Sequence, residues 1–354
     1  MNEDMKSKIT EIAFSEKETW NCIVKSFADF DVFYLNEYVA AFFAESPKNG
    51  LPLLLYYENG NDRAINVVFQ RDIALDEKMK GKIETGQYYD LISPYGYGGF
   101  WGEISDFDEL NKAYNEFCVS RRYVCEFVRF ELFGEYRKHY DGEIETRTYN
   151  VVRSLSMSID DMWMDFKPKV RKNVKKASSC GLEIIIENTD EHLRDFLDIY
   201  YSTMDRSNAE KEYYFSRSFF EILSGMKNNI MYFHAVYQGK IVSTEMVIFG
   251  AENGYSFLGG TDKNHFDLRP NDFLKFEVIK WAKERGLRNF VLGGGYGSND
   301  GIFQYKACFA PNGIVNFYIG RKIFDDENYR KLVTIRAEEN PDCRNSQYFP
   351  KYRA

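Results

Sequence analysis

The segment 291–313 combines clustered glycines with a single lysine, a pattern that could serve substrate binding or catalysis. It reads VLGGGYGSNDGIFQYKACFAPNG, a strand-like pair followed by glycines and then by Lys306 among aromatic side chains. A P-loop carries its lysine directly after its last glycine, whereas Lys306 follows the third of the consecutive glycines, Gly295, by eleven positions. Glycines instead let a backbone approach a substrate closely. We therefore expect Lys306, with Gly294 and Tyr305 beside it, to contact a diphosphate or stabilise an oxyanion; the alternative is a solvated surface lysine.

Two carboxylates are candidate proton acceptors for an amine nucleophile. Glu245 stands in the strand-like segment IVSTEMVIF (241–249), where alternation places it on the face of Ile241 and Val247. A half-buried carboxylate at this position would have a raised pKa, which suits a general base. The alternative for Glu245 is an exposed strand face or an ion pair with a lysine. Asp262, just after a Gly-Gly pair, is the second candidate.

Basic and aromatic side chains elsewhere in the chain could bind an anionic substrate. The stretch 160–181 is rich in cations, and those at i, i+4 spacing share a helix face that would attract phosphate. The stretch 88–102 mixes glycines with rings that could wall a cleft and stack on a sugar or base. The alternatives are a solvated charged face and simple packing. The substrate-binding candidates in these two stretches are Arg171, Lys172, Lys175, Tyr95, Tyr97 and Trp101.

The bulk composition argues against several kinds of partner and site. The net charge is −8, and broad binding of DNA needs a basic surface. The six cysteines contain no C-x-x-C pair and the four histidines lack ligand spacing, so we expect a reducing cytoplasm and no metal. No apolar run approaches the roughly 20 residues of a membrane-spanning helix. We therefore expect no membrane span.

The predicted elements follow the same order twice along the chain. A helix, two or three antiparallel strands, a second helix and a further strand recur, with a join near 141–156. The clearest pieces are a hairpin over 51–73, a three-stranded meander over 230–262, and a helix from an Asn271/Asp272 cap to Gly286. The pattern predicts two α/β domains, 1–150 and 151–354, with mixed, mostly antiparallel sheets flanked by helices.

Four stretches together resemble one known family. They are YYDLISPYGYGGFWG, VRKNVKKASSCGLEI, LRPNDFLKFEVIKWAKERGLRNFVLGGG and DGIFQYKACFAPNG. In this order and spacing they are similar to the FemAB-like proteins, whose Fem-type members transfer amino acids to build peptidoglycan cross-bridges. The resemblance implies two tandem domains of the GNAT acyltransferase fold. The sequence departs from the family because 181–232 holds no long helical arm and because Ala310 replaces the usual glycine.

The resemblance also locates the segment that binds the pyrophosphate of acyl-CoA in a GNAT domain. That segment is a Q/R-x-x-G-x-G/A loop at a helix start, where backbone N–H groups face the anion. The corresponding residues here are RPNDFL (269–274), in which both glycine positions are lost and one is acidic. An acidic side chain at this place repels phosphate. Arg269 and Asn271 stay candidate substrate-binding residues, and the alternative is that Asn271 only caps the helix.

The resemblance implies a cytoplasmic transferase that moves an acyl or aminoacyl group onto an amine. The acceptor would be a nucleotide- or lipid-diphosphate-linked cell-envelope precursor, with aminoacyl-tRNA as donor and no tightly bound cofactor. Peripheral association with a membrane is compatible with such an acceptor. One alternative is an N-acetyltransferase that uses acyl-CoA and acts on an amino sugar or small amine. The other is a non-catalytic binding protein with the same fold.

Overall fold

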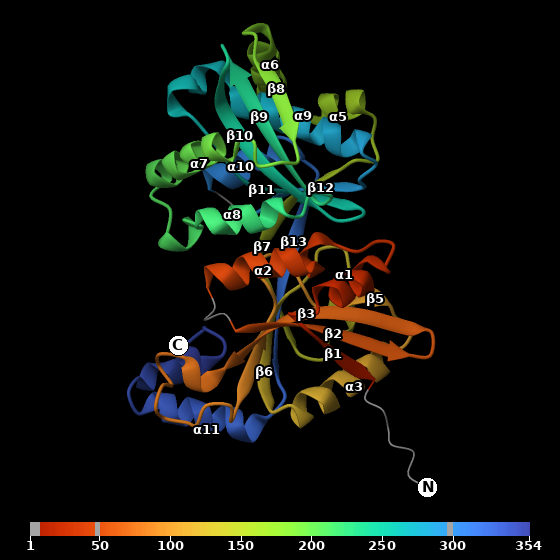
Figure 1. The fold of residues 1–354 in the computed structure, drawn as a ribbon, viewed down its shortest axis with the longest axis vertical. Helices are drawn as coiled ribbons and strands as arrows, with labels where there is room; N and C mark the ends of the chain where they lie inside the picture. Colours follow the sequence, from red (N-terminus) through yellow and green to blue (C-terminus); the bar gives the residue numbers. More distant parts are fainter. Residues whose placement is uncertain (1–7, 47–49, 296–299) are drawn as a thin grey trace. The chain divides into compact units, whose positions relative to one another are not determined.

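The computed structural model describes residues 8–46, 50–295 and 300–354, so residues 296–299 of the glycine-rich segment lie outside the described part. The chain forms two compact units (Figure 1). Unit 1 holds the described residues of Met1–Phe27, Phe33–Arg147 and Phe317–Ala354, and unit 2 holds Ala28–Val32 and Thr148–Asn316. Apart from the short segment Ala28–Val32, the chain changes unit within β7 (Glu143–Ser154) and again within β13 (Ile314–Ile323).

Unit 1 is built on a mixed sheet with helices packed against it. The sheet order is β1-β2-β3-β4-β6-β13, with β5 paired to β3. Strands β4 and β6 run parallel, whereas the pairs β1·β2, β2·β3, β3·β4, β3·β5 and β6·β13 are antiparallel. The predicted hairpin is confirmed, since β2 pairs with β3 from Leu51↔Gln70 to Asn59↔Asp62. Besides β13, the strands and helices of unit 1 are β1 (Ile9–Ala13), β2 (Leu51–Asn59), β3 (Asp62–Asp72), β4 (Tyr89–Ile92), β5 (Trp101–Glu103), β6 (Tyr123–Arg129), α1 (Lys17–Lys25), α2 (Asn36–Glu45), α3 (Phe107–Ser120), α4 (Tyr136–His139) and α11 (Asp326–Ala337).

Unit 2 repeats this type of architecture. Its sheet order is β7-β12-β11-β10-β9-β8, and β11 and β12 run parallel. The predicted meander is confirmed as the antiparallel strands β9, β10 and β11. Its strands and helices are β8 (Glu183–Glu187), β9 (Ile230–Tyr237), β10 (Lys240–Phe249), β11 (Asn253–Thr261), β12 (Asn289–Gly293), α5 (Ile159–Asp165), α6 (Pro168–Ser179), α7 (Leu193–Ser207), α8 (Arg217–Ser224), α9 (Pro270–Glu284) and α10 (Gly301–Ala307).

The predicted fold class, α/β with mixed sheets flanked by helices, is confirmed in both units. The predicted domain division at residue 150 stays a prediction. The contact-defined units change close to it, at Arg147/Thr148, but Phe317–Ala354 lies with unit 1. The physical reason is pairing, because β13 forms a ladder with β6 over Ile319–Ile323.

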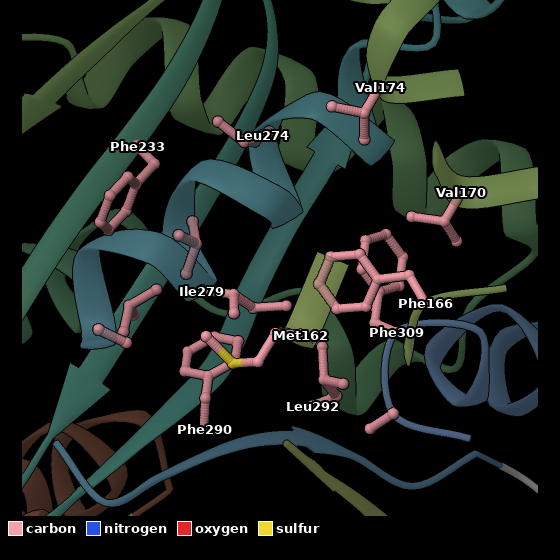
Figure 2. Close-up of a cluster of buried hydrophobic side chains, with 14 of the residues drawn as sticks. Met162, Phe166, Val170, Val174, Phe233, Leu274, Ile279, Phe290, Leu292 and Phe309 are labelled. Carbon is pink, nitrogen blue, oxygen red and sulfur yellow. The ribbon is translucent and has the colours of Figure 1, made fainter. Parts of the chain in front are cut away.

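The core of unit 2 fixes the helix α9 against the sheet. Its residues Leu274, Val278 and Ala282 recur every four positions and are fully buried, as expected for the apolar stripe of a surface helix. Figure 2 shows Leu274 and Ile279 of this helix with Phe233 and Phe290 from the strands. The same core holds residues from α5, α6 and the α10 region, so it also positions the start of α9 and the segment after β12.

The start of α9 differs from the predicted cap. The helix begins at Pro270, and Arg269 is its N-cap in the left-handed conformation, with φ of 59°. The predicted Asn271/Asp272 cap is therefore wrong, because proline with its fixed φ suits the first helical position and moves the boundary two residues earlier. Asp272 instead accepts a hydrogen bond of 3.2 Å from Asn173 Nδ2 of α6.

Candidate active site

A cavity of about 500 Å³ lies within unit 2. Strands β10 and β11 form its floor, and the end of α7, the start of α9 and α10 supply the rest of its lining. Five of the predicted site residues line it: Lys306, Glu245, Arg269, Asn271 and Tyr305. These five residues lie up to 61 positions apart in the sequence, and the fold brings them to one cavity.

Lys306 is held at this cavity by the short helix α10. Asp300 begins the helix, because its Oδ1 accepts a hydrogen bond of 2.7 Å from Phe303 N. The side chains of Phe303 and Phe309 are buried in the core of unit 2 and fix the helix on both sides of the lysine. The Nζ of Lys306 donates a hydrogen bond of 2.6 Å to the carbonyl oxygen of Gly294. This uses one of the three donors of an ammonium group.

The glycines before α10 allow the backbone to come close to the Lys306 ammonium group. Gly293 has a φ of +84°, a conformation that side chains with a Cβ rarely adopt. A Cβ at this position would lie 3.2 Å from Lys306 Nζ, and a Cβ at Gly294 would lie 2.7 Å from the carbonyl oxygen of Tyr149. The glycine pair thus brings a backbone carbonyl directly against the ammonium group.

The environment of Lys306 makes its ammonium group unusually acidic. Burial and, to a smaller extent, the nearby Lys275 charge lower the pKa of Lys306 to about 8, although the charges of Glu245 and Asp300 oppose this. The group therefore changes charge close to neutral pH, where an ordinary lysine stays protonated. This is the kind of perturbed group that clusters at functional sites.

The low pKa of Lys306 predicts an alkaline loss of activity. If the charged ammonium is needed, kcat should fall as the pH rises through about 8, because the proton is lost there. The same lowered pKa means that the unfolded chain binds more protons between about pH 8 and the ordinary value of 10.5, so this group makes the folded state more stable as the pH rises. The deprotonation of Lys306 therefore does not unfold the protein, and unfolding would not explain the fall in kcat. A kcat–pH profile of the wild type and of Lys306→Arg tests this. Arginine keeps its charge, so the fall in kcat near pH 8 should be absent from the variant.

Glu245 and Lys275 form a buried ion pair at the floor of the cavity. Lys275 Nζ donates hydrogen bonds to Glu245 Oε1 at 2.5 Å and to Ser256 Oγ at 2.6 Å. The side chains of the two charged residues are only 5% and 7% exposed. The ion pair with a lysine, one of the alternatives for Glu245, is therefore what the structure contains. Lys275 of α9 holds the carboxylate in one orientation at the cavity.

Tyr305 supplies a hydroxyl to the same cavity. Within the part of the chain that the structure describes, this buried hydroxyl has no hydrogen-bond partner. Burial raises the pKa of Tyr305 well above its usual value, and the charges of Asp272 and Glu245 raise it further. The group therefore stays protonated and can donate a hydrogen bond to a molecule in the cavity.

The cavity is electrically positive although the chain is acidic. Its lining contains four cationic and two acidic side chains, a formal charge of +2 in a protein of net charge −8. The positive side chains are Arg206, Arg269, Lys275 and Lys306. Burial also raises the pKa of one of the two acids, Asp272, which the hydrogen bond from Asn173 only partly opposes. A concave site with focused positive charge attracts anionic ligands.

Asp262 lies just beyond the cavity lining, after Thr261. Its carboxylate accepts a hydrogen bond of 3.0 Å from Asn264 N and contacts His265 Nδ1 at 3.0 Å. Burial alone would raise the pKa of Asp262, but these hydrogen bonds outweigh it and the pKa lies below its usual value. A weakly basic carboxylate that begins a 3-10 helix favours a structural role, so its catalytic role stays a prediction.

The basic helix does not contribute to the cavity lining. In α6, Arg171 donates hydrogen bonds to the carbonyl oxygens of Met164 and Phe166, which end α5. Lys172 and Lys175 are exposed on the same helix. Arg171 therefore joins two helices, and the predicted role of this face in substrate binding stays a prediction.

The aromatic candidates of the loop 88–102 belong to unit 1. Tyr95 is 45% exposed and stacks on Phe42 at 5.1 Å. Tyr97 is buried and packs edge-on against Phe33 and Phe317. Trp101 begins β5 and lies close to Gly134, where an added Cβ would be 3.2 Å from its ring. Packing, the alternative for these rings, accounts for Tyr97. Their binding role is untested.

Several cavity residues were not predicted as site residues. Lys275 had a detectable signal, because it lies four residues before Ile279 on the buried face of α9, where an isolated cation needs a partner. Arg206, Thr244 and Ser256 carry no such signal. Each is a common residue type in an ordinary element, and only the fold brings it to the cavity.

The part of unit 2 that contains the cavity matches a known family. A family model described as "Acetyltransferase (GNAT) domain" matches residues 165–307. The chain is 24% identical over 86 residues to the lipid II:glycine glycyltransferase of Staphylococcus epidermidis and over 85 residues to that of Staphylococcus haemolyticus. These matches cover 24% of this chain but only 21% and 20% of the two relatives. The aligned segment thus spans about a fifth of their length.

Solved structures share the fold over almost the whole chain. The crystal structure of FemX has a TM-score of 0.66 at 12% identity and covers 92% of this chain and 99% of its own. A conserved protein of unknown function from Bacteroides thetaiotaomicron has a TM-score of 0.58 at 10% identity, and the match covers 90% of this chain and 100% of that protein's chain. At such identities the likeness concerns the fold. The matched GNAT domain, the segment related to the glycyltransferases and the fold shared with FemX together support the resemblance to the FemAB-like proteins.

Proposed function

We propose that this protein is an acyltransferase that moves an acyl or aminoacyl group onto an amine of a diphosphate-linked cell-envelope precursor. The observation that carries the proposal is the positive cavity of unit 2, with Lys306 in its lining. A diphosphate is the anion that such a lining fits, because arginine and lysine bind phosphate oxygens through charge-assisted hydrogen bonds. The relatives named lipid II:glycine glycyltransferase support a peptidoglycan-type acceptor.

The cavity contains the groups that a direct transfer requires. The acceptor nitrogen attacks the acyl carbon, a C–N bond forms, and the former carbonyl oxygen becomes an oxyanion. The ammonium of Lys306 stabilises this oxyanion, with the Tyr305 hydroxyl as a second donor. Glu245 receives the proton of the amine, directly or through a water. The tetrahedral intermediate then collapses: the bond from the acyl carbon to the donor oxygen or sulfur breaks, and this leaving atom takes the proton that Glu245 received. No protein nucleophile is required.

Aminoacyl-tRNA is the proposed donor. The segment 269–274 supports this choice, because its two glycine positions carry Asp272 and Leu274. The Asp272 carboxyl stands in the first turn of α9 and lines the cavity, where it disfavours a pyrophosphate at the helix N-terminus. We propose a cytoplasmic location for this reaction. Among the described residues no helix is long and apolar enough to cross a membrane, and peripheral contact with a lipid-linked acceptor belongs to the proposal.

Acyl-CoA is the second candidate donor, with an amino sugar or small amine as acceptor. The match of residues 165–307 to the acetyltransferase family model favours it. Thermal denaturation with and without CoA separates the two candidates, since a ligand that binds only the folded state raises Tm with concentration. A Tm unchanged at millimolar CoA supports tRNA, whereas a saturable rise supports CoA.

Transfer of label tests the proposed function directly. The full chain is mixed with tRNA charged with radiolabelled amino acids and with UDP-linked or lipid-linked muropeptide, and the label in the muropeptide is measured. We expect label from one or a few amino acids, and we expect none when the muropeptide amine is acetylated beforehand. Absence of transfer over a complete amino-acid panel, with both acceptors, would contradict the proposal.

A further inference from the structure

Three ligand-type side chains meet in unit 2 outside the lining of the cavity. Glu187 ends the edge strand β8, His192 precedes α7, and His234 lies in β9 beside β8. One ligand atom from each residue lies within 4.8 Å of the other two. The two histidines are 42 positions apart in the sequence. The prediction of no metal from histidine spacing could not include this grouping, because the strand pairing creates it.

The spacing of the three groups fits a transition metal. His192 Nδ1 and Glu187 Oε2 are hydrogen-bonded at 2.8 Å, and Glu187 Oε1 lies 3.4 Å from His234 Nε2. A tetrahedral zinc ion with ligands at about 2.0–2.1 Å separates neighbouring ligand atoms by roughly 3.3 Å. Two imidazoles and one carboxylate are donors that suit Zn²⁺ and its neighbours in the first transition row rather than Ca²⁺ or Mg²⁺.

His234 is oriented as a metal ligand would be. It is fully buried, and its Nδ1 is hydrogen-bonded to Thr244 Oγ1 at 2.8 Å. This bond fixes the ring and directs Nε2 toward Glu187 and His192, in the way that an outer hydrogen bond orients a ligating histidine. The Nε2 atom is buried and makes no hydrogen bond within the described residues. A buried imidazole nitrogen without a hydrogen bond is costly unless something binds it.

We propose that Glu187, His192 and His234 form a binding site for one divalent transition metal of the zinc class, with a water as the fourth ligand. His192 is 27% exposed at its side chain, so the site opens to solvent on that side. The ion would join β8, β9 and the start of α7. The other end of α7 supplies Thr203 and Arg206 to the cavity lining. A metal at this site would therefore hold the start of the helix whose other end lines the proposed active site.

Zinc binding to the full chain tests the site. The protein is stripped with a chelator and titrated with ZnCl₂ by calorimetry. We expect a stoichiometry of one and an affinity in the micromolar range or tighter. His192→Ala should weaken binding at least about tenfold, because even outer partners of a zinc ligand contribute about 10–100-fold. Because the His192 side chain is partly exposed, we expect His192→Ala to keep the fold. Glu187→Gln should weaken binding as well, and its Tm without zinc checks folding.

His265→Ala is the matched control. His265 also faces a carboxylate, Asp262 Oδ2 at 3.0 Å, but among the described residues no third ligand group joins these two. This variant should bind zinc like the wild type. Cobalt substitution should give the visible absorption of a tetrahedral nitrogen–oxygen site, and His192→Ala should remove it. No zinc binding, or zinc binding unchanged by His192→Ala, as for an ion held by the six free thiols, would overturn the proposal.

Discussion

Replacing Lys306 with alanine is expected to lower kcat of the proposed transfer by about 10²–10³-fold, the usual loss for a donor to a developing oxyanion. The reason is that its Nζ lines the cavity and is fixed there by the Gly294 carbonyl and by α10. Most of the effect should fall on kcat if the ammonium acts on the transition state, and on KM if it only binds the diphosphate of the acceptor. Single-turnover and steady-state transfer rates separate the two.

Two further variants make this result specific. Lys306→Arg should recover part of the activity, because the charge is kept while its geometry changes. Lys227→Ala removes an exposed lysine of unit 2 that does not line the cavity, and it should leave kcat unchanged. A Lys306→Ala protein that folds normally and transfers at the wild-type rate would show that Lys306 has no part in the reaction.

Breaking the ion pair of Glu245 and Lys275 is expected to cause the largest loss of stability. Glu245→Gln leaves the Lys275 ammonium buried without its counter-charge. Lys275→Met likewise leaves the Glu245 carboxylate buried without its counter-charge. Removing one partner of a buried pair costs about 3–5 kcal/mol. Both side chains are at most 7% exposed, so the remaining charge is only poorly solvated when its partner is lost. Urea unfolding followed by tryptophan fluorescence measures the change, and Trp163 and Trp281 report on unit 2 because both pack against its core.

The double variant distinguishes the pair from its two members. Glu245→Gln combined with Lys275→Met removes both charges, so we expect it to be more stable than either single variant, since a buried ion pair and neutral residues of similar volume are often of similar stability. It should still lack proton transfer and show little activity. Single losses that add up in the double variant would mean that the two residues do not interact energetically.

Much of the fold could be predicted because its signals are local. Two strand-like runs around a turn predicted the hairpin of β2 and β3, and the stretch closed by Gly286 predicted the helix α9. The position of Arg269 could not be predicted in the same way. Capping preference favoured Asn271 and Asp272, but Pro270 took the first position of the helix and left both inside it.

The candidate site was predictable in part. Lys306 and Glu245 could be proposed because a lysine among glycines and aromatics, and a carboxylate within an apolar strand, conflict with their surroundings. The partner of Glu245 was open, because any of many lysines could have served. The strand and helix packing of unit 2 selects Lys275, which lies 30 positions further along the chain.

The sequence by itself therefore determined the α/β class, the main elements of both units and the residue types capable of acyl transfer, since each depends on neighbours within a few turns of the chain. Only the tertiary structure decided which charges share the cavity, that its formal charge is +2, and that Glu187, His192 and His234 meet. These are results of strand pairing and helix packing between distant segments, and burial at those contacts sets the pKa of Lys306.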